Sequence, residues 1–277
     1  MATASLTLIV LALASYAASA GLFLAHLVSK RAWLATGGLR LLMAAMSLHG
    51  AGKVLRFIDL GAIPVTGSLE ALNLLALFVA VVFVYVARRY GVPALGAFAT
   101  PFAFVTLAAS LAFSPDSTGV IPSALQSAWF PVHLGFSITA DALFMVAGAA
   151  SVTYLVQERY LRKKKLGNAF RKLPPLHVLD EICHRLIVVG WLLMTAGMVA
   201  GAFFAKQKWG AYWSWDPRQT WSLLTWLLFA AILHARITVG WQGRRAAWLT
   251  LVTVGLVLLA LVGLDALTTT RHGGEYL

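Results

Sequence analysis

Long apolar runs constrain this chain more than any other feature. Hydrophobic residues make up 60% of its 277 residues, and charged residues only 12%. Because a helix needs about 20 mostly apolar residues to cross a bilayer, we predict eight spans, at roughly 6–28, 37–58, 69–87, 93–113, 131–156, 182–205, 218–239 and 247–267. Lipid offers no partners for backbone polar groups, and the runs lack the alternation of a membrane barrel. The sequence therefore predicts an all-α, polytopic membrane bundle, with residues 1–277 forming a single domain.

The first span contains "ASA" at Ala18 to Ala20, which is similar to a signal-peptide cleavage site. However, no basic residue precedes the span, and its apolar run continues through Val28. Signal peptides have a basic start and a shorter apolar core. We therefore expect this span to be retained as an anchor.

Basic residues predict the orientation of the bundle. They gather in alternate connections, at Lys30, Arg31 and Arg40, at Arg88 and Arg89, in the stretch 158–172, and at Arg236, Arg244 and Arg245. Cytoplasmic connections are enriched in Lys and Arg. Both termini and the connections 59–68, 114–130 and 206–217 are therefore expected on the extracytoplasmic side. The net charge of +12 then reflects topology, and no nucleic-acid partner is expected, because the basic residues flank spans and not a soluble binding fold.

One connection has an unusual composition. The stretch "WGAYWSWDPRQTW" at 209–221 places four tryptophans, an aspartate and an arginine within thirteen residues. Tryptophan is enriched where helices leave the bilayer, but such a belt is spread over several helix ends. Here a single connection carries three of them, Trp209, Trp213 and Trp215. With Tyr212, and with Gly210 permitting close backbone approach, they predict a flat aromatic surface for a large planar ligand.

The second half of this stretch also has a structural interpretation. Asp216 stands where a helix N-cap belongs, Pro217 suits the first helical position, and Gln219 completes a D-x-x-Q capping box. Asp216 is therefore expected to act chiefly as a cap that holds the aromatic connection at the membrane surface, which is compatible with a place beside the ligand. Arg218 and Trp221 follow on the same helix and complete the candidate site.

Four histidines indicate what the aromatic surface binds. In the predicted topology, His133 lies at the outer end of the fifth span and His272 just beyond the eighth, on the side of the Trp-rich connection. His49 and His234 lie inside the second and seventh spans, where an ionisable group is a functional candidate. Any one of them alone is better explained by a hydrogen bond between helices. Their grouping favours two bis-imidazole haem sites, because haem iron takes such axial ligands and the macrocycle is flat.

Other chemistry is not indicated. Cys183 is the single cysteine, so no disulfide, CxxC pair or thiolate metal site can form within the chain. The sequence shows neither a glycine-rich nucleotide-binding connection nor a Ser/His/Asp arrangement.

These residues resemble a known family. The segment "WGAYWSWDPRQTWSLLTWLLFAAILHAR" at 209–236 is similar to the tryptophan-rich "WWD" signature of haem-handling proteins, and its "WDPRQTW" resembles the CcsA/ResC-type cytochrome c assembly proteins of system II more than the CcmC type. The similarity includes "FPVHLGFSITADALF" around His133, and "RHGGEYL", which stands where the family has its second external histidine. The Trp signature is the specific part, and the isolated histidines would be weak evidence without it.

The resemblance implies a role in cytochrome c biogenesis. Haem b, at one or two sites, would pass from His49 and His234 to an outer site where His133 and His272 ligate the iron. The aromatic connection 206–218 would hold the ring. The haem propionates would need positive partners, for which Arg218 is the nearest candidate in sequence, and Lys206, Lys208, Arg56 and Arg271 are expected on the same side. An apocytochrome c with a CxxCH motif would receive the haem. A CcsB/ResB-type membrane protein is the implied partner, in the bilayer of a bacterial cytoplasmic membrane or a thylakoid.

Several alternatives stay open. Asp141, eight residues after His133, places a carboxyl group about 12 Å deeper in the fifth span, where it is either neutral and hydrogen-bonded or functionally polar. Plastid-type relatives have a histidine before the third span where this chain has Ala62, so depth is the basis for choosing His49. No catalytic residue is assigned, and the role of a synthase subunit is left open. The rival functions are a HemX-like haem-binding regulatory protein without ligase activity, a transporter with an aromatic gate, and a scaffold that binds no ligand.

Overall fold

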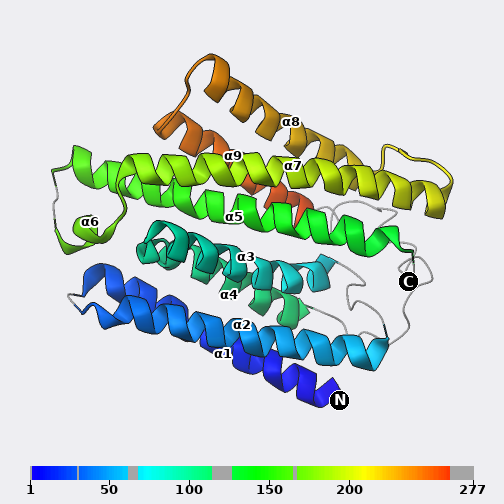
Figure 1. Ribbon diagram of the computed structural model, residues 1–277, viewed down its shortest axis with the longest axis horizontal. Coiled ribbons are helices and arrows are strands. Elements are labelled where there is room, and N and C mark those ends of the chain that lie inside the picture. Colours follow the sequence, from blue (N-terminus) through cyan, green and yellow to red (C-terminus); the bar gives the residue numbers. More distant parts are fainter. Residues whose placement is uncertain (1, 30, 62–67, 114–126, 165–166, 263–277) are drawn as a thin grey trace.

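The computed structural model describes residues 2–29, 31–61, 68–113, 127–164 and 167–262, and within these residues the chain is a bundle of helices without strands (Figure 1). The helices are α1 (Ala2–Val28), α2 (Trp33–Leu60), α3 (Ser68–Tyr90), the 3-10 turn η1 (Pro93–Leu95), α4 (Gly96–Phe113), α5 (Trp129–Arg162), α6 (Asn168–Lys172), α7 (Leu176–Trp209), α8 (Pro217–Thr238) and α9 (Arg244–Val262). Eight of these helices are long and apolar enough to cross a membrane. The prediction of an all-α membrane bundle with eight spans is confirmed.

Two spans are longer than their apolar cores. α5 and α7 each have 34 residues, which corresponds to about 51 Å of helix. The hydrocarbon core of a bilayer is only about 30 Å thick, so both helices extend past it. The predicted spans 131–156 and 182–205 marked the apolar part alone, because polar side chains at a helix end remain in water and do not stop the helix.

The helices lie roughly antiparallel in successive layers. Figure 1 shows the pair α1 and α2 on one side, then α3 and α4, then α5 and α7, with α8 on the far side; α9 passes behind α7 in this view and packs on both α5 and α8. The start of α1, the start of α3, the start of α5 and the α7–α8 connection lie at one end of the bundle, which we call the Trp end. The residues flanking the connections 59–68, 114–130 and 206–217 therefore share an end, as predicted. α6 and the polar stretch around it lie at the opposite, polar end.

α5 and α7 make the most extensive interhelical contact, because α7 presents glycines to α5. A Cβ atom on these glycines would meet α5 at distances that real Cβ atoms do not show: 2.6 Å to Phe144 Cε1 from Gly190, 2.8 Å to Ser137 Oγ from Gly197, and 2.7 Å to His133 Nδ1 from Gly201. Helices in lipid associate through close packing and not through hydrophobic burial. The glycines thus make α5 and α7 the tightly packed centre of the bundle.

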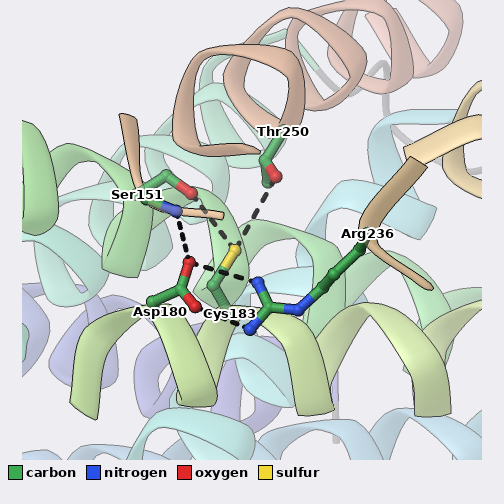
Figure 2. A network of polar contacts seen from close by, with 6 residues as sticks. Ser151, Asp180, Cys183, Arg236 and Thr250 are labelled. Atoms are coloured by element: carbon green, nitrogen blue, oxygen red, sulfur yellow. Dashed lines mark hydrogen bonds and ion pairs between the residues drawn. The ribbon is translucent and has the colours of Figure 1, made fainter. Parts of the chain in front are cut away.

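At the polar end, Asp180 of α7 ties α8 and α9 together (Figure 2). Its carboxylate accepts hydrogen bonds from the Arg236 guanidinium at 3.1 and 2.6 Å, and from the Gly243 backbone N–H at 2.8 Å. The Asp180 and Arg236 side chains are only 14% and 16% exposed. Next to this pair, Cys183 Sγ lies 3.3 Å from Ser151 Oγ of α5 and 3.7 Å from Thr250 Oγ1 of α9. Four long helices therefore meet in one polar network.

Removing the Asp180 carboxylate should destabilise the bundle strongly. In Asp180→Ala, the Arg236 charge stays largely buried without its partner, and such a loss costs about 3–5 kcal/mol. We expect a clear fall in the thermal unfolding midpoint in detergent. Glu181→Ala is the matched control, because Glu181 pairs with Arg185 at side chains that are 48% and 58% exposed, and exposed pairs contribute about 0–1 kcal/mol. Equal midpoints for the two variants would contradict the role of the network.

Candidate functional site

The Trp-rich connection begins where α7 ends. Gly210 adopts a left-handed conformation with φ of 78°, and its N–H donates to the Lys206 carbonyl at 3.0 Å. Glycine reaches this conformation without steric cost and is the common residue just past a helix end. Lys206 Nζ donates to the Gly210 carbonyl at 2.8 Å. Gly210 therefore turns the chain back over the end of the bundle, and it is not among the residues that line the cavity described below.

The connection ends at a well-formed helix cap. Asp216 is only 5% exposed, and its Oδ1 accepts a hydrogen bond from the Arg218 N–H at 2.9 Å, with Pro217 at the first helical position. The predicted N-cap is confirmed. The second half of the predicted capping box is different, because Gln219 Oε1 reaches past the cap and accepts from the Ser214 N–H at 2.9 Å. Gln219 thereby fixes the connection itself to α8.

A cavity of about 220 Å³ lies at the Trp end, between α5, α7, α8 and the connection. His133 of α5 and Arg218 of α8 lie on its wall. Three aromatic side chains belong to the same wall: Trp209, which was expected in the connection and is the last residue of α7, and Tyr212 and Trp213 of the connection. The structure thus brings together five of the residues singled out from the sequence. The deeper part of the wall includes Asp141, one of the polar residues that follow His133 along α5.

His133 is held in one orientation by α7. Its Nδ1 lies 2.8 Å from the Gly197 carbonyl oxygen, and because a carbonyl only accepts, Nδ1 must carry the proton. In a neutral imidazole the other nitrogen, Nε2, then has the lone pair. Histidines that ligate metals characteristically donate their second N–H to a carbonyl or carboxylate in this way. His133 therefore has the tautomer that iron ligation through Nε2 requires.

Two tryptophans of the connection have different environments. Trp213 Nε1 is buried and has no hydrogen-bond partner among the described residues, although it belongs to the cavity wall. Trp215 packs edge-on against Trp213 at a centroid separation of 5.7 Å, but it is 71% exposed and does not line the cavity. Its φ of 55° is unusual for a residue other than glycine. Trp215 therefore supports Trp213 from outside.

The cavity wall also contains residues that sequence reasoning missed. They come from α5, α7 and α8 and include Ser137, Met198, Gly201, Gln219 and Ser222. The spacing Gly197-x-x-x-Gly201 was the available signal, because two small residues one turn apart indicate close helix contact. Trp221, by contrast, was expected at the site and lies on α8 outside the cavity wall.

His49 has a complete set of partners in the N-terminal half of the bundle. Its side chain is fully buried, its Nε2 lies 2.8 Å from Asn73 Oδ1 of α3, and its Nδ1 lies 3.4 Å from the Tyr16 hydroxyl of α1. These contacts join the first three helices. The geometry is that of a histidine that holds helices together.

The predicted pairing of His49 with His234 is not formed. His234 is exposed on α8, and α2 and α8 lie on opposite sides of the bundle (Figure 1). Depth along a span placed both imidazoles at the right level, but depth carries no information about which helices are neighbours. Haem iron cannot be ligated by both residues in this arrangement.

His272, predicted as the second outer ligand, lies outside the described residues. Within the residues that the structure describes, no group of three or more His, Cys, Asp or Glu side chains is arranged to hold a metal ion.

Comparison with protein families gives one decisive match. The model of the family described as "Cytochrome C assembly protein" matches residues 62–272. This range includes α3 to α9, the cavity and the whole Trp-rich connection. The chain belongs to the cytochrome c assembly protein family. The resemblance seen in the sequence is confirmed, and membership supports a role in cytochrome c biogenesis.

Individual relatives of this cytochrome c assembly protein agree. It is 33% identical over 261 residues to the cytochrome c biogenesis protein CcsA of Synechococcus sp. strain CC9902, covering 85% of this chain and 86% of the relative. It is 32% identical over 275 residues to CcsA of Prochlorococcus marinus strain MIT 9303. Among solved structures, the cytochrome c haem lyase CcmF matches 99% of this chain with a TM-score of 0.72. At 18% identity, and with 48% of CcmF covered, this likeness shows a common fold.

The cap at Asp216 allows a direct test of how the assembly protein holds its Trp-rich connection. Asp216→Ala removes the acceptor for the Arg218 N–H, which should lower the free energy of unfolding by about 0.5–2 kcal/mol and increase the solvent quenching of tryptophan fluorescence. Asp216→Asn should keep both properties near wild type, because asparagine caps as well as aspartate. An equal loss of stability in both variants would contradict this expectation, because it would show that Asp216 contributes through its charge and not through its cap.

Proposed function

We propose that this chain holds haem at the Trp end and presents it for attachment to an apocytochrome c. The observation that carries the proposal is His133, whose Nδ1 donates to the Gly197 carbonyl on the wall of a cavity that also includes Trp209, Tyr212 and Trp213. An imidazole whose Nε2 carries the lone pair, beside a wall of aromatic rings, suits iron in a flat macrocycle.

The size of the cavity supports a ligand that is only partly enclosed. Its volume of about 220 Å³ is below the roughly 300–1,000 Å³ of pockets that enclose a small molecule. Haem would therefore lie with one edge in the cavity and another outside, beside exposed Tyr212 and Trp215. An accessible edge is what covalent attachment requires, because the reacting thiols belong to a second protein.

Polar groups on the wall suit the carboxylates of haem. Arg218 supplies a positive charge and Trp213 Nε1 supplies a buried donor without a partner among the described residues. A buried donor costs about 1–3 kcal/mol when it is left unsatisfied, so a propionate oxygen within its reach would recover that energy. A salt bridge between the long, flexible Arg218 side chain and a propionate contributes little where solvent reaches it. Axial ligation and ring stacking are therefore expected to dominate the affinity for haem.

The remaining parts of the proposed site come from the family resemblance. His272 supplies the second axial ligand to haem b, and the connection 206–218 faces the extracytoplasmic side of a bacterial cytoplasmic membrane or a thylakoid. A CxxCH motif would place two thiols at the accessible edge. In each attachment the S–H bond adds across a vinyl double bond, so that a C–S bond forms and the hydrogen ends on the other vinyl carbon. Nothing is released, and the protein contributes positioning.

His234 supports the proposal of a membrane partner. It lies inside the α8 span with its side chain exposed, and a polar group facing lipid is unfavourable unless something polar covers it. A CcsB/ResB-type protein packed on α8 would bring a second ligand to an inner haem, which His49 cannot do. Exposed Leu224, Leu227 and Ile237 lie on the same helix.

His133 is the residue whose loss should remove haem from the outer site. We expect His133→Ala to lose the six-coordinate absorption spectrum of the purified protein, because one axial ligand is gone. His177→Ala is the matched control, since His177 is exposed on the first turns of α7 at the polar end. His272→Ala should resemble His133→Ala. Unchanged spectra in both the His133 and the His272 variants would refute the outer site, and bound haem without cytochrome c maturation would favour the HemX-like alternative.

The two histidines inside spans should behave differently from one another. His49→Ala leaves Asn73, which is 4% exposed, without its partner, and we expect a loss of about 1–3 kcal/mol in stability with an unchanged haem spectrum. His234→Ala should leave stability unchanged and should lower the haem content only when the membrane partner is co-expressed. The measurements are unfolding midpoints and haem content. Loss of haem in His49→Ala without loss of stability would restore His49 as a ligand.

A further inference from the structure

Two glycines of α7 form a notch that receives the His133 ring. Gly197 and Gly201 lie one turn apart on the face of α7 that packs on α5. His133 Nδ1 reaches the Gly197 carbonyl at 2.8 Å. A Cβ atom on Gly201 would lie 2.7 Å from Nδ1, 2.9 Å from Cε1 and 3.5 Å from Cγ of the same ring. The imidazole therefore occupies the space that any side chain at position 201 would take.

The notch explains how a helix carbonyl can accept from an imidazole. Within a helix, the carbonyl of residue 197 already faces the N–H of residue 201, and only its second lone pair can accept another bond. That lone pair is approached from beside the helix, over residue 201. With no side chain there, the ring comes close enough for the hydrogen bond that selects the Nδ1–H tautomer.

We propose that Gly201 is a positioning residue for haem ligation, because its missing side chain lets His133 bond to Gly197 and so sets both the tautomer and the direction of Nε2. This inference rests on the proposed function. Gly201 itself does not ligate iron, and its effect on haem runs entirely through the imidazole.

General helix packing is the competing explanation, and other glycines of the chain separate the two. Gly190 makes an equally close approach in the same α5–α7 contact, where a Cβ atom would lie 2.6 Å from Phe144 Cε1, and neither residue lines the cavity. Gly135 lies on α5, two residues after His133, with open space where its Cβ would be. Gly190→Ala therefore perturbs the α5–α7 packing without touching His133. Gly135→Ala shows the effect of a glycine-to-alanine change near His133 that creates no clash.

The experiment titrates haemin into the purified full-length variants and records the absorption and low-spin EPR spectra, together with unfolding midpoints. Gly201→Ala should weaken haemin binding by about 10- to 100-fold, as loss of a partner that orients a ligand does. It should also shift the EPR g values, which report the orientation of the axial imidazoles. Gly190→Ala should lower the unfolding midpoint and leave the g values unchanged. Gly135→Ala should change neither.

A second comparison tests whether Gly201 acts through the ring. In His133→Ala the ring is gone and the space beside residue 201 is open. Adding Gly201→Ala to that variant should then alter neither the residual haemin affinity nor the unfolding midpoint. Should the single variant Gly201→Ala fail to fold while the double variant with His133→Ala folds, that rescue would show that the clash with the His133 ring is what destabilises the single variant.

The outcomes separate this inference from the proposed function. Unchanged spectra in both His133→Ala and His272→Ala would overturn the outer site itself. Loss of ligation in His133→Ala, with normal affinity and g values in Gly201→Ala, would overturn only the role of Gly201. An equal loss of affinity from Gly201→Ala in the His133→Ala background would also overturn it, because the effect would then not run through the imidazole.

Discussion

Lipid supplies no hydrogen-bond partner, and this constraint governs the structure from the backbone to the candidate site. It requires helices, and it requires that the polar side chains inside the bundle find partners on neighbouring helices. His49 bonds to Asn73 across α2 and α3, and Asp180 binds Arg236 across α7 and α8. Close packing holds the helices together, because apolar side chains gain little free energy from leaving a solvent that is itself apolar. The glycines of α7 are therefore as important to the bundle as its large side chains.

The same constraint shapes the cavity at the Trp end. The hydrogen bond from His133 to Gly197 satisfies a part-buried N–H and at the same time selects the nitrogen that carries the lone pair. Trp213 Nε1 is an exception, as a buried donor without a partner among the described residues. Other buried polar atoms without a partner occur among the described residues, for example on Thr100 and Gln157. Trp213 Nε1 differs from these in belonging to a residue of the cavity wall, where a ligand could accept from it.

Features that depend on a few consecutive residues were predicted correctly, whereas pairings between distant segments were not. The capping motif predicted the start of α8 correctly, because a cap depends on a few consecutive residues. The hydrogen bond predicted for Gln219, to the backbone of the cap residue, was wrong. Gln219 accepts from the Ser214 N–H instead, because its partner depends on how the connection folds back. The pairing of His49 with His234 failed for a different reason. Helical rise gives the depth of a residue, whereas the choice of neighbouring helices comes from packing over the whole bundle.

The sequence by itself determined the eight spans, their alternation between two ends, the cap at Asp216 and, through its Trp signature, the family. These follow from apolar length, turn chemistry and local motifs, which act over a few turns of chain. Only the tertiary structure decided that His133 meets Gly197 and Gly201, that three aromatic residues at the end of α7 and after it share a cavity with Arg218, and that His234 faces outward. Such contacts depend on which helix faces lie against each other. That choice is made by close packing between segments distant in sequence, and no local pattern records it.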